Sequence, residues 1–431
     1  MKRNRRKSWK SSASVVVTGY GAVTALGRDA HSTWRRLCAG ESGVAQITLF
    51  DASPFYSHEA AEIKDLQGIS TRWPIGRAVS SNNSGLQLFD GRASLDRGSI
   101  FLRAACREAV HSADLAETIR VRPERVGLVA GTTLGGMTYG TRFYREYRAR
   151  GAGRAHASLL RDYLLHGQTE CAARSLGIGG PVVTVTNACA AGTSALGIAS
   201  AFIRAGKADV VLAGGFDSFC EFIFAGFSSL QAIAREKCRP FDRRRNGMVL
   251  GEGAGIIALE SGLNARSRER VPRTELLSVA DSCDAYHITR PDPGGEGAAR
   301  AMARALKEAE LEPAEIGYVN AHGTGTQSND EAEAVALAKV FGAELQNVLV
   351  SSTKAAVGHL LGGAGGVEAV FTVMALEDGS LPPTTNHDVI APECAGLQVI
   401  RSRAIERRVD AAMSSSFGFG GQNSVAVFGA V

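Results

Sequence analysis

One cysteine of the chain stands where its thiol could act as a nucleophile. Cys189 lies in Thr186-Asn-Ala-Cys-Ala-Ala-Gly-Thr-Ser, between a β-branched segment and small residues that suit a helix through Arg204. Such a strand-to-helix elbow places the thiol beside the unpaired N–H groups and positive dipole end of the helix, which favours a thiolate. The alternative is a buried structural cysteine, the commonest fate of a free cysteine, and we assign it to the other seven.

Two histidines and a lysine lie in glycine-bounded segments of the second half. His322 stands in Val319-Asn-Ala-His-Gly-Thr-Gly-Thr, and His359 follows Lys354 by five residues in Lys354-Ala-Ala-Val-Gly-His-Leu-Leu-Gly. A single histidine is more often a core or surface residue, but this set at strand ends favours a site. A thiolate with two imidazoles suits acyl transfer through a thioester, in which the imidazoles donate hydrogen bonds to a carbonyl oxygen that gains negative charge.

A glycine-rich turn near the C-terminus could complete this site. Phe417-Gly-Phe-Gly-Gly-Gln-Asn offers backbone N–H groups for an oxyanion hole, although it could equally be an ordinary turn between two strands. The sequence contains no HExxH, paired CxxC, GxxxxGK[ST] or clean GxGxxG, so neither a metal site nor a phosphate-binding loop is indicated.

Internal repetition indicates how these residues could be brought together. Three segments of the first half match three of the second in the same order: Val126-Gly-Leu-Val-Ala-Gly with Ile316-Gly-Tyr-Val-Asn-Ala, Pro181-Val-Val-Thr-Val-Thr with Val348-Leu-Val-Ser-Ser-Thr, and Asp209-Val-Val-Leu-Ala-Gly with Asp410-Ala-Ala-Met-Ser-Ser. Strands alternate with helices, so we predict an α/β fold of two duplicated halves that meet near residue 265. Sites of open α/β sheets lie beyond the carboxyl ends of strands, where two such ends would share one pocket.

Composition excludes several other classes of protein. The 431 residues are 45% hydrophobic and 21% charged, as in ordinary globular proteins, and no apolar stretch reaches the length of a membrane span. The eight cysteines form no CxxC pair, which favours reduced thiols and a cytoplasmic protein. The first ten residues hold six basic residues and no acid, so the formal charge of +5 becomes 5 − 6 = −1 for the rest. A solvated basic tail over residues 1–12 is the simpler interpretation, and an arm that contacts an acidic partner or nucleic acid is the other.

Taken together, the motifs resemble the β-ketoacyl-[acyl-carrier-protein] synthases of the elongating Cys-His-His type, including type II polyketide ketosynthases. The resemblance runs from about Val15 to Phe428 and is carried by Cys189 in its elbow, Asn320-Ala-His-Gly-Thr-Gly-Thr, Lys354…Gly-His359, Ser416-Phe-Gly-Phe-Gly-Gly and Asp284-Ala-Tyr-His-Ile-Thr. It implies a thiolase-type fold with α-β-α-β-α layers, residues 13–265 carrying the cysteine and residues 266–431 the histidines and lysine. It also implies a homodimer, or a heterodimer with a related ketosynthase-like chain, and no nucleic acid or membrane span.

The resemblance assigns roles to individual residues. Cys189 would accept the acyl chain, and His322 and His359 would bind the malonyl thioester and stabilise the enolate left by decarboxylation. Substrates would arrive on the phosphopantetheine arm of an acyl carrier protein, with no tightly bound cofactor and no metal. The remaining roles are the supporting lysine Lys354, the carboxylates Asp330, Glu333 and Glu368, the pantetheine threonines Thr324 and Thr326, the gate Phe419, and Leu134 in the acyl pocket.

Some features depart from the family pattern and leave the pathway open. Ala190 and Ala191 follow the cysteine, where a hydroxyl residue is more usual. Thr324-Gly-Thr-Gln-Ser-Asn-Asp resembles polyketide enzymes more than fatty-acid ones, whereas Asp284-Ala-Tyr-His-Ile-Thr resembles fatty-acid enzymes more. A degradative thiolase would need a cysteine in the C-terminal glycine-rich loop, and Cys394 lies outside that loop. A non-catalytic chain-length-factor-like subunit would lack the nucleophile, which this sequence retains.

Overall fold

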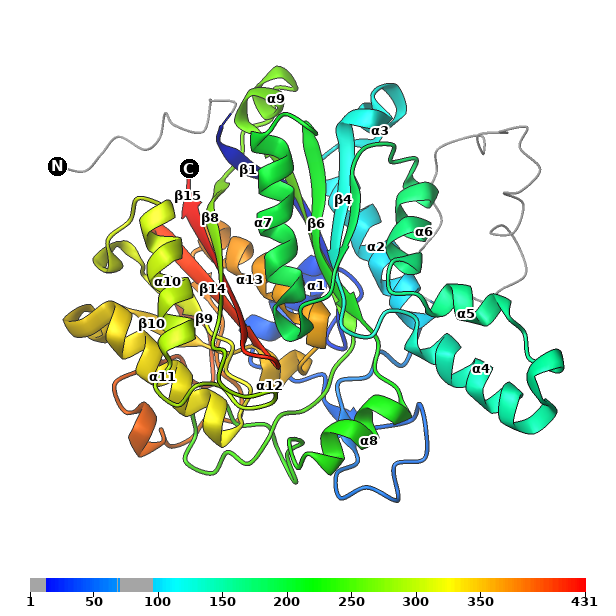
Figure 1. Cartoon of the computed structure of the whole chain (residues 1–431). Coiled ribbons are helices and arrows are strands. Elements are labelled where there is room, and N and C mark those ends of the chain that lie inside the picture. Colours follow the sequence, from blue (N-terminus) through cyan, green and yellow to red (C-terminus); the bar gives the residue numbers. More distant parts are fainter. Residues whose placement is uncertain (1–12, 68, 70–95) are drawn as a thin grey trace.

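The computed structural model describes residues 13–67, 69 and 96–431, so the predicted basic tail of residues 1–12 lies outside the described residues. A central sheet of eleven strands dominates the molecule (Figure 1). Its strands follow the order β12 (Gln398–Val399), β10 (Leu349–Ser351), β9 (Tyr318–Asn320), β14 (Ala411–Gly418), β15 (Gln422–Ala430), β8 (Thr274–Cys283), β1 (Val15–Val23), β7 (Gly253–Ser261), β6 (Val210–Asp217), β4 (Val126–Gly131) and β5 (Val182–Val185).

The sheet consists of two halves with the same strand pairing. In the first half β5, β4 and β6 are parallel, and β7 and β1 add antiparallel. In the second half β10, β9 and β14 are parallel, and β15 and β8 add antiparallel. The halves join where Val16 and Val17 of β1 pair with Glu275 and Thr274 of β8. The three sequence repeats fall on β4 and β9, β5 and β10, and β6 and β14, which confirms the predicted duplication.

Helices form the remaining layers. The helices α7 (Ala191–Arg204) and α13 (Ala364–Asp378) contact strands of both halves and so lie between them. On the outer faces, α2 (Arg97–Ser112) and α6 (Gly167–Leu176) cover the first half, and α10 (Glu296–Glu308) and α11 (Gln327–Phe341) cover the second. The predicted α-β-α-β-α arrangement is therefore confirmed.

Small residues allow the two inner helices to approach closely. A Cβ on Gly192 of α7 would lie 2.6 Å from the Gly366 nitrogen of α13, so only glycine permits this contact. The side chains of α13 are buried from Ala364 to Leu376, as expected for a helix with apolar residues on all faces. The close packing of α7 and α13 thus fixes the segments that precede the two helices, and these segments carry the predicted site residues Cys189 and His359.

One hydrophobic core unites the two halves. The largest cluster contains Val129 and Leu196 of the first half together with Val370 and Phe428 of the second. Trp34 of α1 (Ala30–Cys38) packs against Phe371 of α13 with ring centroids 6.1 Å apart. Burying each such side chain contributes about 1.5–3 kcal/mol, so the halves stabilise one another. The division at residue 265, which falls within α9 (Gly262–Ser267), stays a prediction.

Two further observations concern membrane-spanning helices and the state of the cysteines. Among the described residues, no helix is long and apolar enough to cross a membrane. All eight cysteines are free thiols, as the sequence predicts.

Candidate active site

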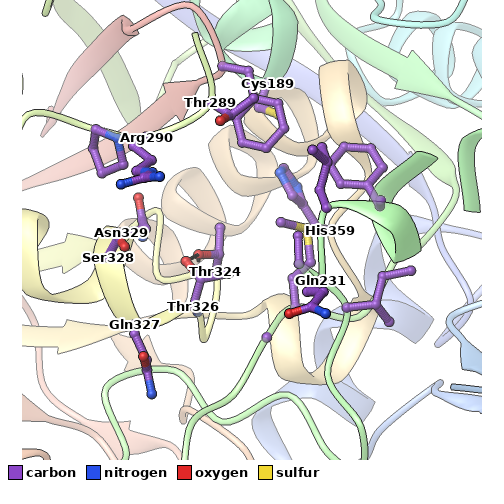
Figure 2. Close-up of a pocket in the computed structure, with 18 of the residues that line it drawn as sticks. Cys189, Gln231, Thr289, Arg290, Thr324, Thr326, Gln327, Ser328, Asn329 and His359 are labelled. Atoms are coloured by element: carbon purple, nitrogen blue, oxygen red, sulfur yellow. Dashed lines mark hydrogen bonds between the residues drawn. The ribbon is translucent and has the colours of Figure 1, made fainter. Parts of the chain in front are cut away.

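The structure brings most of the predicted site residues to one cavity of about 900 Å³ at the ends of the strands. Cys189, reached from β5, lies on its wall together with His322, which follows β9, and His359, which follows β10 and the short helix α12 (Lys354–Val357). Thr324, Thr326 and Phe419 line the same cavity. Figure 2 shows the cysteine, His359 and the two threonines facing one space. The nucleophile and the imidazoles therefore come from opposite halves, as the repetition predicted.

A tight turn presents Cys189 to the cavity. The residue lies in a 3₁₀ turn, Ala188–Ala190, directly before α7, and Ala188 adopts a left-handed φ of 53°. Its neighbour Asn187 donates a hydrogen bond to Ser194 Oγ at 2.8 Å, and that hydroxyl donates to Asp281 Oδ1 at 2.7 Å. These contacts anchor both sides of the turn, because a left-handed conformation of a non-glycine residue costs energy and persists only where its surroundings hold it.

The resting state of the thiol differs from the sequence-based expectation. Burial raises the pKa of Cys189 to about 12, while the charge of Lys354 and the backbone N–H of Phe419 lower it by less. The predicted preference for a thiolate is therefore wrong for the resting protein, because desolvation of the charged sulfur outweighs its position at the helix start. A reaction at this sulfur must remove its proton as the new bond forms.

Backbone contacts hold the two imidazoles together. Their ring centroids are 5.3 Å apart with an interplanar angle of 83°. The N–H groups of His322 and Gly323 donate to the two carboxyl oxygens of Glu333 at 2.8 and 2.7 Å. The N–H of His359 donates to the Val249 carbonyl at 2.7 Å. Each histidine is thus fixed by its main chain, which leaves its ring free for a ligand.

Both rings favour the neutral form. Burial lowers the pKa of His322 and of His359 well below the usual value, and the charge of Lys354 lowers both further. In each ring Nδ1 is buried with no hydrogen-bond partner among the described residues, so Nε2 is the nitrogen left for a ligand in the cavity. A neutral imidazole can donate from that nitrogen or accept a proton there.

The supporting charges lie buried behind the cavity. Lys354 forms an ion pair with Glu368, and both side chains are almost completely buried. Burial raises the pKa of Glu368 to about 7 despite this lysine, and raises the pKa of Glu333 to about 8. Asp330 is also buried and accepts the N–H groups of Phe241 and Gly325 at 2.7 and 3.1 Å. Burial rules out plain surface charge for all three carboxyl groups.

Phe419 and the two threonines line the cavity. Phe419 follows β14 in a turn where Gly420 and Gly421 have φ angles of 83° and 77°, and its ring packs on Phe227 with centroids 5.7 Å apart. Its backbone N–H reaches the sulfur of Cys189, as an oxyanion-hole donor would. The Thr324 and Thr326 hydroxyls hydrogen bond to each other at 2.8 Å.

Leu134, like Lys354 and the three carboxyl groups, does not line the cavity. It is outside the cavity wall and packs in an apolar cluster with Phe224, Ile233 and Met248. The last two residues do line the cavity, so this cluster backs its wall. Among the described residues, no group of three or more His, Cys, Asp or Glu side chains could hold a metal ion.

Sequence reasoning missed several residues at this site. Phe227 and Arg290 line the cavity, but neither stands in a pattern that marks it in the sequence. Asp217 is buried at the end of β6, where its carboxylate accepts hydrogen bonds from two other turns. Its signal was present, because an acid directly after the apolar run Val210-Val-Leu-Ala-Gly-Gly-Phe sits at a strand end like the other site residues.

Comparisons with known proteins agree with this geometry. The family models for the beta-ketoacyl synthase N-terminal and C-terminal domains match residues 12–265 and 274–388. The 3-oxoacyl-[acyl-carrier-protein] synthase 2 of Synechocystis sp. is 36% identical over 423 residues, covering 96% of this chain and 97% of that one. The enzyme of the same name from Staphylococcus aureus (strain COL) is 34% identical over 420 residues, with the same coverage.

Solved structures give the same result. The ishigamide ketosynthase/chain length factor is similar with a TM-score of 0.87 and 33% identity, over 97% of this chain and 99% of that one. A beta-ketoacyl synthase from Burkholderia phymatum STM815 is similar with a TM-score of 0.85 and 30% identity, over the same shares. The duplicated fold, the shared cavity and these matches lead to one conclusion: the chain belongs to the beta-ketoacyl synthase family.

Proposed function

We propose that this protein elongates an acyl chain by two carbons through decarboxylative Claisen condensation, with Cys189 as nucleophile and His322 and His359 as the malonyl-binding pair. The observation that carries the proposal is the meeting of this thiol and two neutral imidazoles, from opposite halves, in one cavity. Relatives named 3-oxoacyl-[acyl-carrier-protein] synthase 2 support the same reaction.

The first half-reaction loads the acyl group onto the enzyme. The sulfur of Cys189 attacks the carbonyl carbon of an acyl thioester, and a neutral imidazole of the pair accepts the thiol proton. The backbone N–H groups of Cys189 and Phe419 stabilise the oxyanion that develops. Collapse of this intermediate expels the carrier thiolate, which takes up a proton and leaves as a thiol.

The second half-reaction forms the new carbon–carbon bond. His322 and His359 donate hydrogen bonds from Nε2 to the thioester oxygen of a malonyl group, and loss of carbon dioxide leaves the bonding electrons on an enolate. The enolate carbon attacks the acyl carbon on Cys189, and the sulfur leaves and regains a proton. The buried Lys354–Glu368 pair supports the two rings electrostatically. Thr324 and Thr326 would hold the pantetheine arm, and the gate Phe419 would move between the half-reactions.

The partners follow from the reaction and from the relatives. An acyl carrier protein would deliver both substrates on its phosphopantetheine arm, without a tightly bound cofactor or metal. One similar structure is described as a type II PKS acyl-carrier protein in complex with its ketosynthase, and others pair a ketosynthase with a chain length factor. We therefore propose a dimer with an identical or a related chain, located in the cytoplasm. Leu134 would influence the acyl pocket through the cluster that backs the cavity.

A product analysis tests the proposal. The protein is incubated with acyl-carrier thioesters of increasing chain length and malonyl-carrier protein, and the products and the Cys189 peptide are identified by mass spectrometry. We expect an acyl adduct on Cys189 and β-ketoacyl products two carbons longer. An unmodified cysteine with no elongated product would favour instead a non-catalytic subunit.

A further inference from the structure

A buried carboxylate joins three segments beside the active site. Asp217, at the end of β6, accepts hydrogen bonds at Oδ1 from Thr132 Oγ1 at 2.6 Å and from the N–H of Leu134 at 3.0 Å. At Oδ2 it accepts from the N–H of Thr133 at 2.8 Å and from the N–H of Gly362 at 2.7 Å. Three of these donors belong to the turn after β4, but Gly362 belongs to the other half of the molecule, three residues after His359.

The turn that contains Gly362 packs tightly and has a strained backbone. Leu361 adopts a φ of 53°, which a side chain disfavours. A Cβ on Gly362 would lie 2.5 Å from the Thr133 nitrogen, and one on Gly192 would lie 2.8 Å from the Gly362 carbonyl oxygen. Gly192 follows Cys189 by three residues. The turn after His359 therefore rests directly on the segment that carries the nucleophile, and the hydrogen bond to Asp217 is a polar contact that holds it there.

From this geometry we propose that Asp217 is a positioning residue, which holds the turn after His359 against the half that carries Cys189 and so fixes this imidazole for decarboxylation. The role rests on the proposed function, because it concerns the same two half-reactions. Asp217 does not touch the reacting atoms; it positions His359 through the turn 360–363, and its charge also raises the pKa of Cys189. His322 is held separately, by Glu333.

The number of donors explains why a carboxylate is needed. Four hydrogen bonds reach the two oxygens, and an amide in the same place offers a single oxygen and an NH₂ group that would face two of the donors. At least one buried N–H then loses its acceptor, which is costly in a site closed to water. If that N–H belongs to Gly362, the turn moves away and carries His359 with it. A displacement of about 1 Å at a catalytic group can cost about 100-fold in rate.

The test separates the two half-reactions in Asp217→Asn. Acetyl transfer from an acetyl-pantetheine thioester to Cys189 is measured by mass spectrometry, and carbon dioxide release is measured from malonyl-carrier protein. We expect decarboxylation to fall about 10- to 100-fold. Acetylation should not fall, because His322 remains to accept the thiol proton and the lost Asp217 charge had raised the pKa of Cys189. Thr132→Val, which removes one of the four donors, should give a smaller loss in the same direction and replaces Asp217→Asn should that variant fail to fold.

Glu108→Gln is the matched control. Glu108 is a partly buried carboxyl group that, like Asp217, accepts backbone N–H groups, here from Ala22 and Ala30 at 2.9 and 2.8 Å. It lies at a second cavity, which Cys189 does not line. Both half-reactions should be nearly unchanged in this control. Equal rates of decarboxylation in Asp217→Asn and wild type, or a parallel fall of both half-reactions, would overturn the positioning role. A wild-type protein that performs neither half-reaction would instead overturn the proposed function.

Discussion

Replacing Lys354 by methionine should reveal how the buried charge pair supports the site. Methionine has a similar length but no charge, so Lys354→Met leaves the Glu368 carboxyl group alone in an interior where both side chains are almost completely buried. Breaking a buried pair by removing one partner costs about 3–5 kcal/mol of unfolding free energy, because the remaining group must either stay charged without compensation or keep a proton. Lys354→Met/Glu368→Gln removes both charges and should recover most of that loss.

The loss of stability in Lys354→Met should increase as the pH rises. The pKa of Glu368 is about 7 in the intact pair, and removing the lysine raises it further. Above about pH 7, the folded variant therefore keeps a proton that both its unfolded chain and the folded wild type release. Stability relative to wild type then falls as the pH rises, by about 1.4 kcal/mol per pH unit at most, or about 2 kcal/mol between pH 7 and about pH 8.5.

Urea unfolding at about pH 6 and about pH 8.5 measures both effects. Circular dichroism reports the overall transition, and tryptophan fluorescence adds a local signal, because Trp34 packs on Phe371 in the same helix as Glu368. Equal stability of wild type and Lys354→Met at the higher pH would refute the reasoning. So would a double variant that is no more stable than the single one.

Other perturbations test the remaining parts of the site. In Lys354→Met the pKa of both histidines should rise, because the lysine charge lowers it, so the acid limb of decarboxylation should move to higher pH in rate profiles. Thr324→Val should raise the KM for carrier-bound thioesters about fivefold with little change in kcat, because about 1 kcal/mol of binding is lost; an unchanged KM would contradict this. Gly418→Ala should slow Cys189 acylation about tenfold in time courses followed by mass spectrometry, because its Cβ would lie 3.0 Å from the Cys189 nitrogen. An acylation rate equal to that of wild type would contradict this expectation. Deleting residues 1–10 should leave turnover at saturating carrier protein unchanged in steady-state assays, and a large loss would mean that the basic arm recruits the carrier.

The architecture could be predicted because the two halves repeat their strands in order. Apolar strands that run into turns of small and polar residues identify β4, β5, β6 and their counterparts, and duplication then dictates that their carboxyl ends meet. The sequence therefore predicts a shared cavity for Cys189 and His322, and both residues line one cavity in the structure. A strand and the turn that follows it are adjacent in the sequence, so the position of a residue after a strand can be predicted from the local pattern.

Contacts between distant segments could not be predicted in the same way. Lys354 pairs with Glu368, whereas Glu333 accepts the backbone N–H of His322, and the sequence does not show which carboxyl group takes which role. The thiol of Cys189 was expected to ionise, but its burial depends on side chains from both halves. The hydrogen bond from the Gly362 N–H to Asp217 likewise joins residues that are 145 positions apart in the sequence. Such contacts arise from packing between layers, for which the sequence holds no periodic signal.

Carbon dioxide release by Cys189→Gln tests most directly whether the two imidazoles support decarboxylation while the sulfur carries the acyl group. With malonyl-carrier protein as substrate, this variant should continue to release carbon dioxide while forming no elongated product, and adding His322→Ala or His359→Ala should stop the release. Elongated product from Cys189→Gln, or carbon dioxide release that persists without the two histidines, would contradict the assignment of nucleophile and malonyl-binding pair.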